Sequence, residues 1–121
     1  MVEDEEVVRQ FGATALGNSG YAVSTAATAA EARQILGRSG FDLLFVDAVL
    51  PDGHGDELAE EEVQRRSATK ILLTSGYPDQ TRLQAALHRH GWPFLQKPYT
   101  MEGLLTAVAR VLRQRPQERS E

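Results

Sequence analysis

Short apolar stretches alternate with helical patterns along this chain, and this alternation restricts the fold more than any other feature of the sequence. Five stretches rich in apolar or β-branched residues lie at 1–2, 21–23, 41–46, 70–74 and 93–96. The segments between them are long enough for the helical crossovers that join parallel strands. The stretch 41–46 is almost continuously apolar, which is typical of a strand covered on both faces. The sequence therefore predicts a three-layer α/β/α fold around a parallel sheet.

The spacing of apolar residues predicts five helices, at about 7–16, 28–36, 55–66, 79–90 and 100–113. Thr28 and Glu31 have the spacing of a capping box, and Thr100 is a suitable N-cap for the last helix. The third helix carries an acidic run that we expect to be a solvated face. This run consists of Glu57, Glu60, Glu61 and Glu62.

Length and composition indicate one globular domain. The chain has 121 residues, of which 41% are hydrophobic and 25% charged, and such a chain can bury a core without disulfides. We expect the domain to span 1–114. Residues 115–121 contain no hydrophobic side chain and are typical of a tail or linker.

Charge and hydropathy exclude several classes of protein. The absence of cysteine rules out a disulfide framework and a thiolate zinc site. No stretch approaches the ~20 apolar residues of a membrane-spanning helix, and the N-terminus is acidic where a secretory signal would be basic. The net charge of −4, without a basic cluster, argues against direct nucleic-acid binding. We therefore expect a cytoplasmic protein with no membrane segment.

Polar residues lie where the predicted strands end. They are Glu3, Asp4 and Glu5 after the first stretch, Asp47 after the third, Thr74 and Ser75 at the end of the fourth, and Lys97 after the fifth. The carboxyl ends of parallel strands meet at one edge of a sheet, so these side chains are expected to converge. Carboxylates bind Mg²⁺, whereas a hydroxyl and an ammonium group can bind phosphoryl oxygens. The set predicts Mg²⁺-dependent phosphoryl transfer to the carboxylate of Asp47.

Four motifs occur in order along nearly the whole chain. They are Val2-Glu-Asp-Glu-Glu-Val-Val-Arg9, Phe41 to Gly55 around Asp47, Ile71-Leu-Leu-Thr-Ser-Gly-Tyr-Pro78 and Phe94-Leu-Gln-Lys-Pro-Tyr99. The acidic pair, Asp47, Thr74 and Lys97 follow one another at intervals of 43, 27 and 23 residues, counted from Asp4. With these motifs the chain strongly resembles the receiver domain of two-component response regulators, and in particular the receivers of hybrid histidine kinases.

The resemblance implies a role for each residue that matches a motif. Asp47 would be the phosphoacceptor, and Glu3 and Asp4 would hold Mg²⁺ together with Asp47 and the backbone carbonyl of Val49. Thr74 and Lys97 would contact the phosphoryl group. Thr74 and Phe94 would then act as the switch pair, and Lys97-Pro98 would form the cis peptide bond that family members often have.

The resemblance also implies a fold and a partner. The fold would be flavodoxin-like, a doubly wound parallel five-stranded sheet in the order 2-1-3-4-5. The phosphoryl donor would be a histidine kinase or a histidine phosphotransfer protein, and phosphorylation would change the face formed by the helix at 79–90, the strand at 93–96 and the last helix. The domain would catalyse its own phosphorylation and dephosphorylation while serving mainly as a signalling switch. Monomeric and dimeric forms, and stand-alone and hybrid-kinase contexts, all agree with the resemblance.

Two departures from the family pattern concern the first motif. The acidic pair is Glu-Asp where the family commonly has Asp-Asp, which should alter the metal geometry without abolishing binding. Only Met1 and Val2 stand in place of the longer apolar stretch that forms the central first strand. We therefore expect a sheet from which most of that strand is missing, unless upstream residues or another chain supply it.

Two other functions agree with parts of the pattern. A receiver-like fold with an incomplete acidic pocket could serve as a protein interaction module that is not phosphorylated. A small phosphohydrolase could also form an aspartyl phosphate, but haloacid-dehalogenase-like enzymes carry a second acid two residues after the nucleophile. That position is Val49 here.

Overall fold

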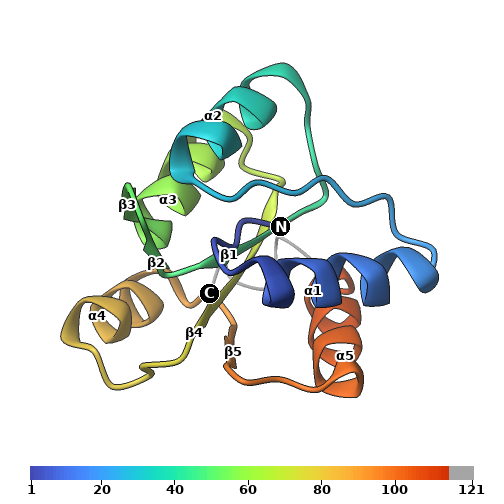
Figure 1. The fold of residues 1–121 in the computed structure, drawn as a ribbon. Coiled ribbons are helices and arrows are strands. Elements are labelled where there is room, and N and C mark those ends of the chain that lie inside the picture. The colour runs from blue at the N-terminus through green and yellow to red at the C-terminus, as the bar shows by residue number, and fades with distance from the viewer. Residues whose placement is uncertain (115–121) are drawn as a thin grey trace.

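The structure is a computed structural model, and it describes residues 1–114. Helices and short strands alternate along the chain (Figure 1). The helices are α1 (Glu6–Asn18), α2 (Ala29–Arg38), α3 (Gly55–Arg65), α4 (Thr81–His90) and α5 (Met101–Leu112). The strands are β1 (Leu43–Asp47), β2 (Val49–Leu50), β3 (Gly53–His54), β4 (Lys70–Ser75) and β5 (Phe94–Gln96).

A parallel sheet in the order β1-β4-β5 forms the centre of the molecule. Beyond β1 the sheet continues as single bridges, because Val2 pairs in parallel with Val46 on one side and with Ala26 on the other. The amide of Val2 donates to the carbonyl of Phe45, and the amide of Asp47 donates to the carbonyl of Val2. The order of the five segments, from Ala26 through Val2 and β1 to β4 and β5, is the doubly wound order that the resemblance implied.

Three of the five segments are strands and two are single bridges, so the expectation that most of the first strand is missing is confirmed. No strand forms at 21–23, and the pairing occurs at Ala26 instead. A strand needs a neighbour along its length, and here Val2 provides a single bridging residue. The short antiparallel pair of β2 and β3, which turns at Pro51 and Asp52, was not predicted at all.

Side chains of alternate residues of β1 and β4 pack on opposite faces of the sheet, as the pleat requires. Leu44, Val46, Ile71 and Leu73 belong to a core shared with α2, α3 and α4. Phe45 and Leu72 belong to a second core shared with α1 and α5. Figure 1 shows α1 and α5 on one side of the sheet and α2, α3 and α4 on the other. The predicted three-layer arrangement is confirmed.

The observed helices agree with the predicted ones to within a few residues. The hydroxyl of Thr28 accepts the amide of Glu31 at 3.1 Å, and the hydroxyl of Thr100 accepts the amide of Gly103 at 2.9 Å. Both threonines are therefore N-caps, as expected. None of the helices within residues 1–114 has the length and apolar content needed to span a membrane.

The acidic run of α3 is not a uniformly solvated face. Glu62 is fully buried, and its carboxylate accepts the hydroxyl of Thr69 at 2.9 Å. The guanidinium groups of Arg65 and Arg66 each lie 3.5 Å from this carboxylate. A buried charge needs such partners, and the partner Thr69 lies outside the helix where a helical pattern does not show it.

Charged side chains tie α4 to α3. The carboxylate of Glu60 on α3 lies 3.0 Å from Arg89 and 2.7 Å from His90 at the end of α4. The ring of His90 stacks on Trp92, with 4.0 Å between the ring centroids and an interplanar angle of 11°. Gly91 between them ends the helix in the left-handed conformation, with φ of 68°. Glycine adopts this conformation without strain.

Candidate functional site

The carboxyl ends of β1, β4 and β5 bring Asp47, Thr74 and Lys97 to one edge of the sheet. Asp47 is the last residue of β1 and pairs in register with Thr74 of β4. Lys97 directly follows β5, and its amide donates to the carbonyl of Ser75 at 2.9 Å. The strand ends that the sequence indicated therefore lie next to one another.

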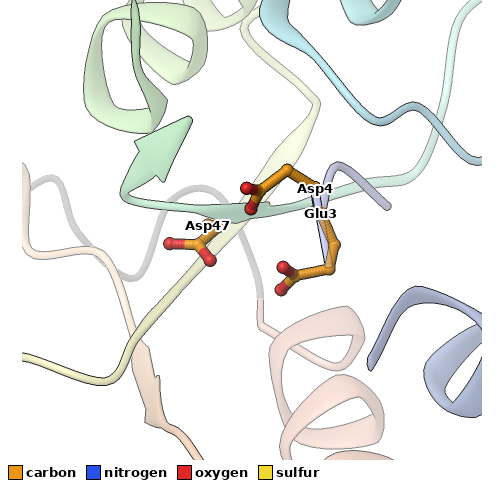
Figure 2. A group of neighbouring side chains, drawn as sticks. All are labelled: Glu3, Asp4 and Asp47. Atoms are coloured by element: carbon orange, nitrogen blue, oxygen red, sulfur yellow. The ribbon is translucent and has the colours of Figure 1, made fainter. Parts of the chain in front are cut away.

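Three carboxylates gather at this edge. Glu3, Asp4 and Asp47 each offer a carboxylate oxygen, and these oxygens lie within 4.8 Å of one another. Figure 2 shows the two residues that follow the Val2 bridge next to Asp47 at the end of β1. Glu3 and Asp47 are buried, whereas Asp4 is exposed. A divalent cation with oxygen ligands suits such a group, since each carboxylate can supply a ligand oxygen at the solvent boundary.

The ammonium group of Lys97 lies between two of these carboxylates. Its Nζ is 2.8 Å from Glu3 Oε1 and 2.5 Å from Asp47 Oδ2, with Glu5 Oε1 at 3.5 Å. Burial alone would lower the pKa of Lys97, but the hydrogen bonds to Asp47 and Glu3 outweigh it and raise the pKa above its ordinary value. Lys97 therefore stays charged throughout the neutral pH range.

Burial also affects Glu3, whose side chain is almost completely enclosed. Desolvation raises the pKa of Glu3, and the hydrogen bonds from Lys97 and from the amide of Glu5 only partly offset that rise. With its three carboxylates ionised, the cluster carries two more negative charges than Lys97 can balance. This excess equals the charge of one divalent cation.

Two neighbouring hydroxyls at the end of β4 have different surroundings. Ser75 Oγ accepts the amide of Tyr77 at 2.9 Å, and this bond shapes the loop that follows the strand. Thr74 Oγ1 is buried and has no hydrogen-bond partner among the described residues. A buried hydroxyl without a partner costs free energy, so the hydroxyl of Thr74 is the one available to a new acceptor.

The loop after β1 is held against the backbone of Asp47. The amide of Val49 donates to Asp47 Oδ1 at 3.0 Å, which fixes the orientation of the carboxylate. The amide of Gly55 donates to the carbonyl of Ala48. A Cβ atom on Gly55 would lie 2.1 Å from the carbonyl oxygen of Asp47, so only glycine fits at this position.

A cavity of about 690 Å³ opens in front of Asp47 and Lys97. Asp4, Glu5, Ser75 and Gly76 add polar groups to its wall, and the other wall residues are mainly apolar. Val7 and Phe11 of α1 and Tyr77 after β4 line it while being 80%, 42% and 65% exposed. Asp47 and Lys97 therefore lie in a cavity that is surrounded by a rim of exposed apolar side chains.

Two aromatic residues flank Lys97. Phe94 of β5 is partly buried and packs against the core on the α4 side, while Tyr99 packs against Phe45 and Phe11 on the other side. The hydroxyl of Tyr99 is buried without a partner among the described residues, and burial raises the pKa of Tyr99 to about 12. The Lys97-Pro98 peptide bond is cis, as the resemblance implied.

The structure brings together most of the residues that were singled out in the sequence. Glu3, Asp4, Asp47 and Lys97 are neighbours, and Val49 lines the cavity with its amide toward Asp47. Thr74 is adjacent through the sheet but does not line the cavity, and Phe94 lies on the far side of β5 from Tyr99. The predicted roles of these residues stay predictions.

Three features of the site were missed in the sequence. They are the glycine contact at Gly55, the buried hydroxyl of Tyr99, and the contact of Arg9 with the acidic segment. Gly55 ended one of the quoted motifs, so a signal was present. Arg9 and Tyr99 also ended quoted motifs, but the burial of the Tyr99 hydroxyl depends on packing against Phe11 and Phe45, and the Arg9 contact depends on its side chain folding back to Glu3.

Comparison with known proteins identifies a family. The family described as "Response regulator receiver domain" matches residues 1–109. The response regulator protein PilR of Pseudomonas aeruginosa is 33% identical over the whole chain, and the sensor kinase CckA of Brucella abortus is 32% identical over 93% of it. The chain spans only 27% and 12% of the lengths of these two relatives.

Solved structures agree with this result. A CheY-like response regulator receiver domain protein from Methanospirillum hungatei has a TM-score of 0.86 and 27% identity, and the match covers 99% of this chain and 94% of that one. The receiver domain of the hybrid histidine kinase CckA has a TM-score of 0.78 and 30% identity, with 93% and 95% of the two chains covered.

Proposed function

Since this chain belongs to the response regulator receiver domain family, the phosphoacceptor module of two-component systems, we propose that it accepts the phosphoryl group on Asp47 from a phosphohistidine. One observation supports Asp47 as the residue that accepts the phosphoryl group. Asp47 is the only one of the three clustered carboxylates that lies at a strand end, contacts Lys97, and faces the cavity with its orientation fixed by a backbone amide. A nucleophile needs such a fixed orientation.

The acidic cluster fits a magnesium ion, as receiver domains generally require. Glu3, Asp4 and Asp47 would hold it, and the backbone carbonyl of Val49 would complete the protein's share of its ligands. When bound, the ion would offset the repulsion between the carboxylate of Asp47 and the anionic phosphoryl group. The excess negative charge of the cluster and the preference of Mg²⁺ for oxygen ligands support this assignment.

In the transfer itself, a carboxylate oxygen of Asp47 forms a bond to phosphorus while the bond from phosphorus to the donor nitrogen breaks. The imidazole leaves with the electron pair of that bond. Lys97, which stays protonated, then exchanges part of its contact with Asp47 for a phosphoryl oxygen. Hydrolysis of the acyl phosphate by water restores the carboxylate and releases inorganic phosphate.

The switch would start at Thr74. Its hydroxyl has no partner in the described residues, and a phosphoryl oxygen on the neighbouring Asp47 would supply one. Movement of Thr74 would free space on β4 beside Phe94, whose ring packs between β5 and the α4 side of the core. The face built from α4, β5 and α5 would change as a result. Such a change needs only a small bistable element biased by new phosphate contacts.

The partner would be a histidine kinase or a histidine phosphotransfer protein. The exposed side chains of Val7, Phe11 and Tyr77 form an apolar rim around the cavity that contains Asp47. A rim of this kind suits the surface of a protein donor, because it can exclude water around the transferring group.

The test is intact mass after incubation with Mg²⁺ and acetyl phosphate. We expect one added phosphoryl group on the wild-type chain, and none on Asp47→Asn or in the presence of EDTA. Asp4→Asn should shift the Mg²⁺ dependence of the reaction to higher concentrations, because Asp4 is the exposed member of the cluster. A phosphoryl group that persists in Asp47→Asn would contradict the choice of acceptor, and labelling that survives EDTA would contradict the role of the metal.

A further inference from the structure

Arg9 contacts the acidic segment in a way that the function proposed above does not use. Its guanidinium Nη1 donates to the carbonyl oxygen of Glu3 at 2.9 Å, and the carbonyl oxygen of Asp4 lies 3.5 Å from the same nitrogen. The side chain thus reaches back from the first turns of α1 to the two residues that carry the acidic pair. These contacts fix the backbone at the point where the chain leaves its single bridge to the sheet and enters the helix.

We propose that Arg9 is a positioning residue for the magnesium site, because it holds the backbone from which the Glu3 and Asp4 carboxylates project. This inference rests on the function proposed above. Arg9 itself would touch neither the metal nor the phosphoryl group. Its effect would pass through the two carbonyls to the orientation of the two side chains.

The charge balance around Arg9 shows that this contact is not an ordinary ion pair. Four acidic residues, Glu3 to Glu6, precede it, yet among residues 1–114 no carboxylate lies within 4.0 Å of its guanidinium group. Near the first turn of a helix the dipole favours acidic side chains over basic ones. Arg9 is therefore in a position that its charge alone does not explain, whereas hydrogen bonds to two carbonyls do explain it.

The rest of the acidic segment is fixed by similar contacts. Glu3 Oε2 accepts the amide of Glu5 at 3.0 Å, and Glu3 Oε1 lies beside Lys97. Glu3 is thus oriented at both its carbonyl and its carboxylate. Asp4 is exposed, and apart from the helix that follows, the Arg9 contact is what restrains its backbone. Groups that orient metal ligands affect metal affinity by about tenfold or more when they are removed.

The direction in which the Mg²⁺ affinity changes when Arg9 is replaced distinguishes a positioning role from a purely electrostatic one. Removing a cation from the neighbourhood of an acidic site should strengthen its binding of Mg²⁺ through Coulomb's law alone. Loss of a positioning group should weaken it. The Arg9→Met variant keeps the length of the side chain and removes the hydrogen bonds together with the charge, so the two explanations predict opposite changes.

The experiment is a Mg²⁺ titration in which backbone amide chemical shifts report binding. For Arg9→Met we expect the dissociation constant for Mg²⁺ to rise about tenfold or more. At saturating Mg²⁺ the rate of phosphorylation by acetyl phosphate should stay within about twofold of wild type, since the ligands themselves are intact. Arg9→Lys, which keeps a donor of similar reach, should restore part of the affinity. The matched control is Arg33→Met, because Arg33 pairs with Glu61 far from the site and should leave the affinity unchanged.

A measurement on the metal-free protein separates this inference from the proposed function. Hydrogen exchange at the amide of Glu5, which donates to Glu3, should be faster in Arg9→Met than in wild type. Unchanged exchange together with an unchanged or tighter Mg²⁺ dissociation constant would overturn the positioning role. A wild-type chain that takes no phosphoryl group would overturn the proposed function instead, and the Glu5 amide would still report on Arg9. If Arg9→Met fails to fold, the same Mg²⁺ titration and hydrogen-exchange measurement can be made on Arg9→Lys, which keeps the charge.

Discussion

Two buried threonines differ in whether their hydroxyl has a hydrogen-bond partner. Thr69 donates to the buried carboxylate of Glu62, whereas Thr74 has no partner among the described residues. The same chemical change at the two positions should therefore have opposite effects on stability.

We expect Thr74→Val to raise the free energy of unfolding of the unphosphorylated protein by about 1 kcal/mol, because a buried hydroxyl without a hydrogen bond is removed. Thr69→Val should lower it by about 2 kcal/mol, because Glu62 then loses a partner inside the protein. Urea denaturation of both variants checks the pair. A destabilised Thr74→Val would show that the hydroxyl is already satisfied in the resting protein.

A second residue-scale prediction concerns Gly55. Its hypothetical Cβ overlaps the backbone carbonyl of Asp47, and backbone atoms cannot rotate aside as a flexible side chain can. Gly55→Ala should therefore destabilise the protein by about 3 kcal/mol and slow its phosphorylation by acetyl phosphate. The control is Gly17→Ala in α1, where a Cβ meets nothing within 4 Å and should stabilise by about 0.5–1 kcal/mol. Equal stabilities of the two variants, measured in urea, would contradict the overlap.

The site could be predicted from the sequence to the extent that strand ends determine it. Asp47, Thr74 and Lys97 each lie at the end of a recognisable strand, and parallel strands bring such ends together. The same rule predicted that Glu3 and Lys97 converge, but not that Lys97 pairs with Glu3 as well as with Asp47, because that choice depends on side-chain packing at the edge. The contact of Arg9 with two backbone carbonyls was equally invisible, since it opposes the usual preference at a helix N-terminus.

At the scale of elements, the β2–β3 turn is attached to the start of α2. The carboxylate of Asp52 accepts the amides of Ala29 at 2.8 Å and Ala30 at 3.0 Å. These hydrogen bonds lower the pKa of Asp52 below its ordinary value of 3.8. The loop that follows Asp47 is thereby linked to the helix next to it.

This link should depend on pH in a defined direction. The carboxylate of Asp52 is more acidic in the folded chain than in the unfolded one, so its contribution to stability is fully present above the unfolded pKa. That contribution is lost as the pH falls through the lowered pKa of the folded state. Asp52→Asn should therefore be less stable than wild type at pH 7, and the difference should shrink below pH ~4. Urea denaturation of both proteins across this range provides the measurement, and a difference that does not change with pH would rule out the carboxylate as its source.

Long elements with a periodic apolar pattern were predicted better than short ones. All five helices were found, including α3, whose apolar face is thin and whose N-cap makes no side-chain hydrogen bond. The strand at 21–23 was predicted from β-branched and aromatic residues alone, but pairing rather than propensity decides where a strand forms. The two-residue strands β2 and β3 are too short to produce any alternating pattern.

For the molecule as a whole, the apolar rim around the cavity predicts how the chain distinguishes its phosphoryl donors. Acetyl phosphate is small enough to reach Asp47 without covering the rim, whereas a phosphohistidine protein, the donor proposed above, would cover it. Val7 is the most exposed of the large apolar side chains that line the cavity. Val7→Ser should slow transfer from a phosphohistidine protein by about threefold to tenfold, through the loss of apolar contact area.

The same substitution should leave the reaction with acetyl phosphate unchanged, because the Val7 side chain is 80% exposed whereas Asp47 is buried. Gln34→Ser, at an exposed position of α2, is the control for a polar change on another helix. Rates of phosphorylation with both donors check the prediction. Equal slowing with acetyl phosphate would show that Val7 acts on the carboxylate cluster and not on the protein donor.

Because Trp92 stacks on His90, the intrinsic fluorescence of this chain reports on the end of α4. The protein has a single tryptophan, so its indole emission has one source. That source lies against an imidazole at the end of α4, and the same imidazole is paired with Glu60 of α3. Indole emission is sensitive to an imidazole in ring contact and to the proton that it carries. Displacement of α4 during signalling would separate the two rings. The fluorescence intensity or emission wavelength of the unlabelled protein would then change.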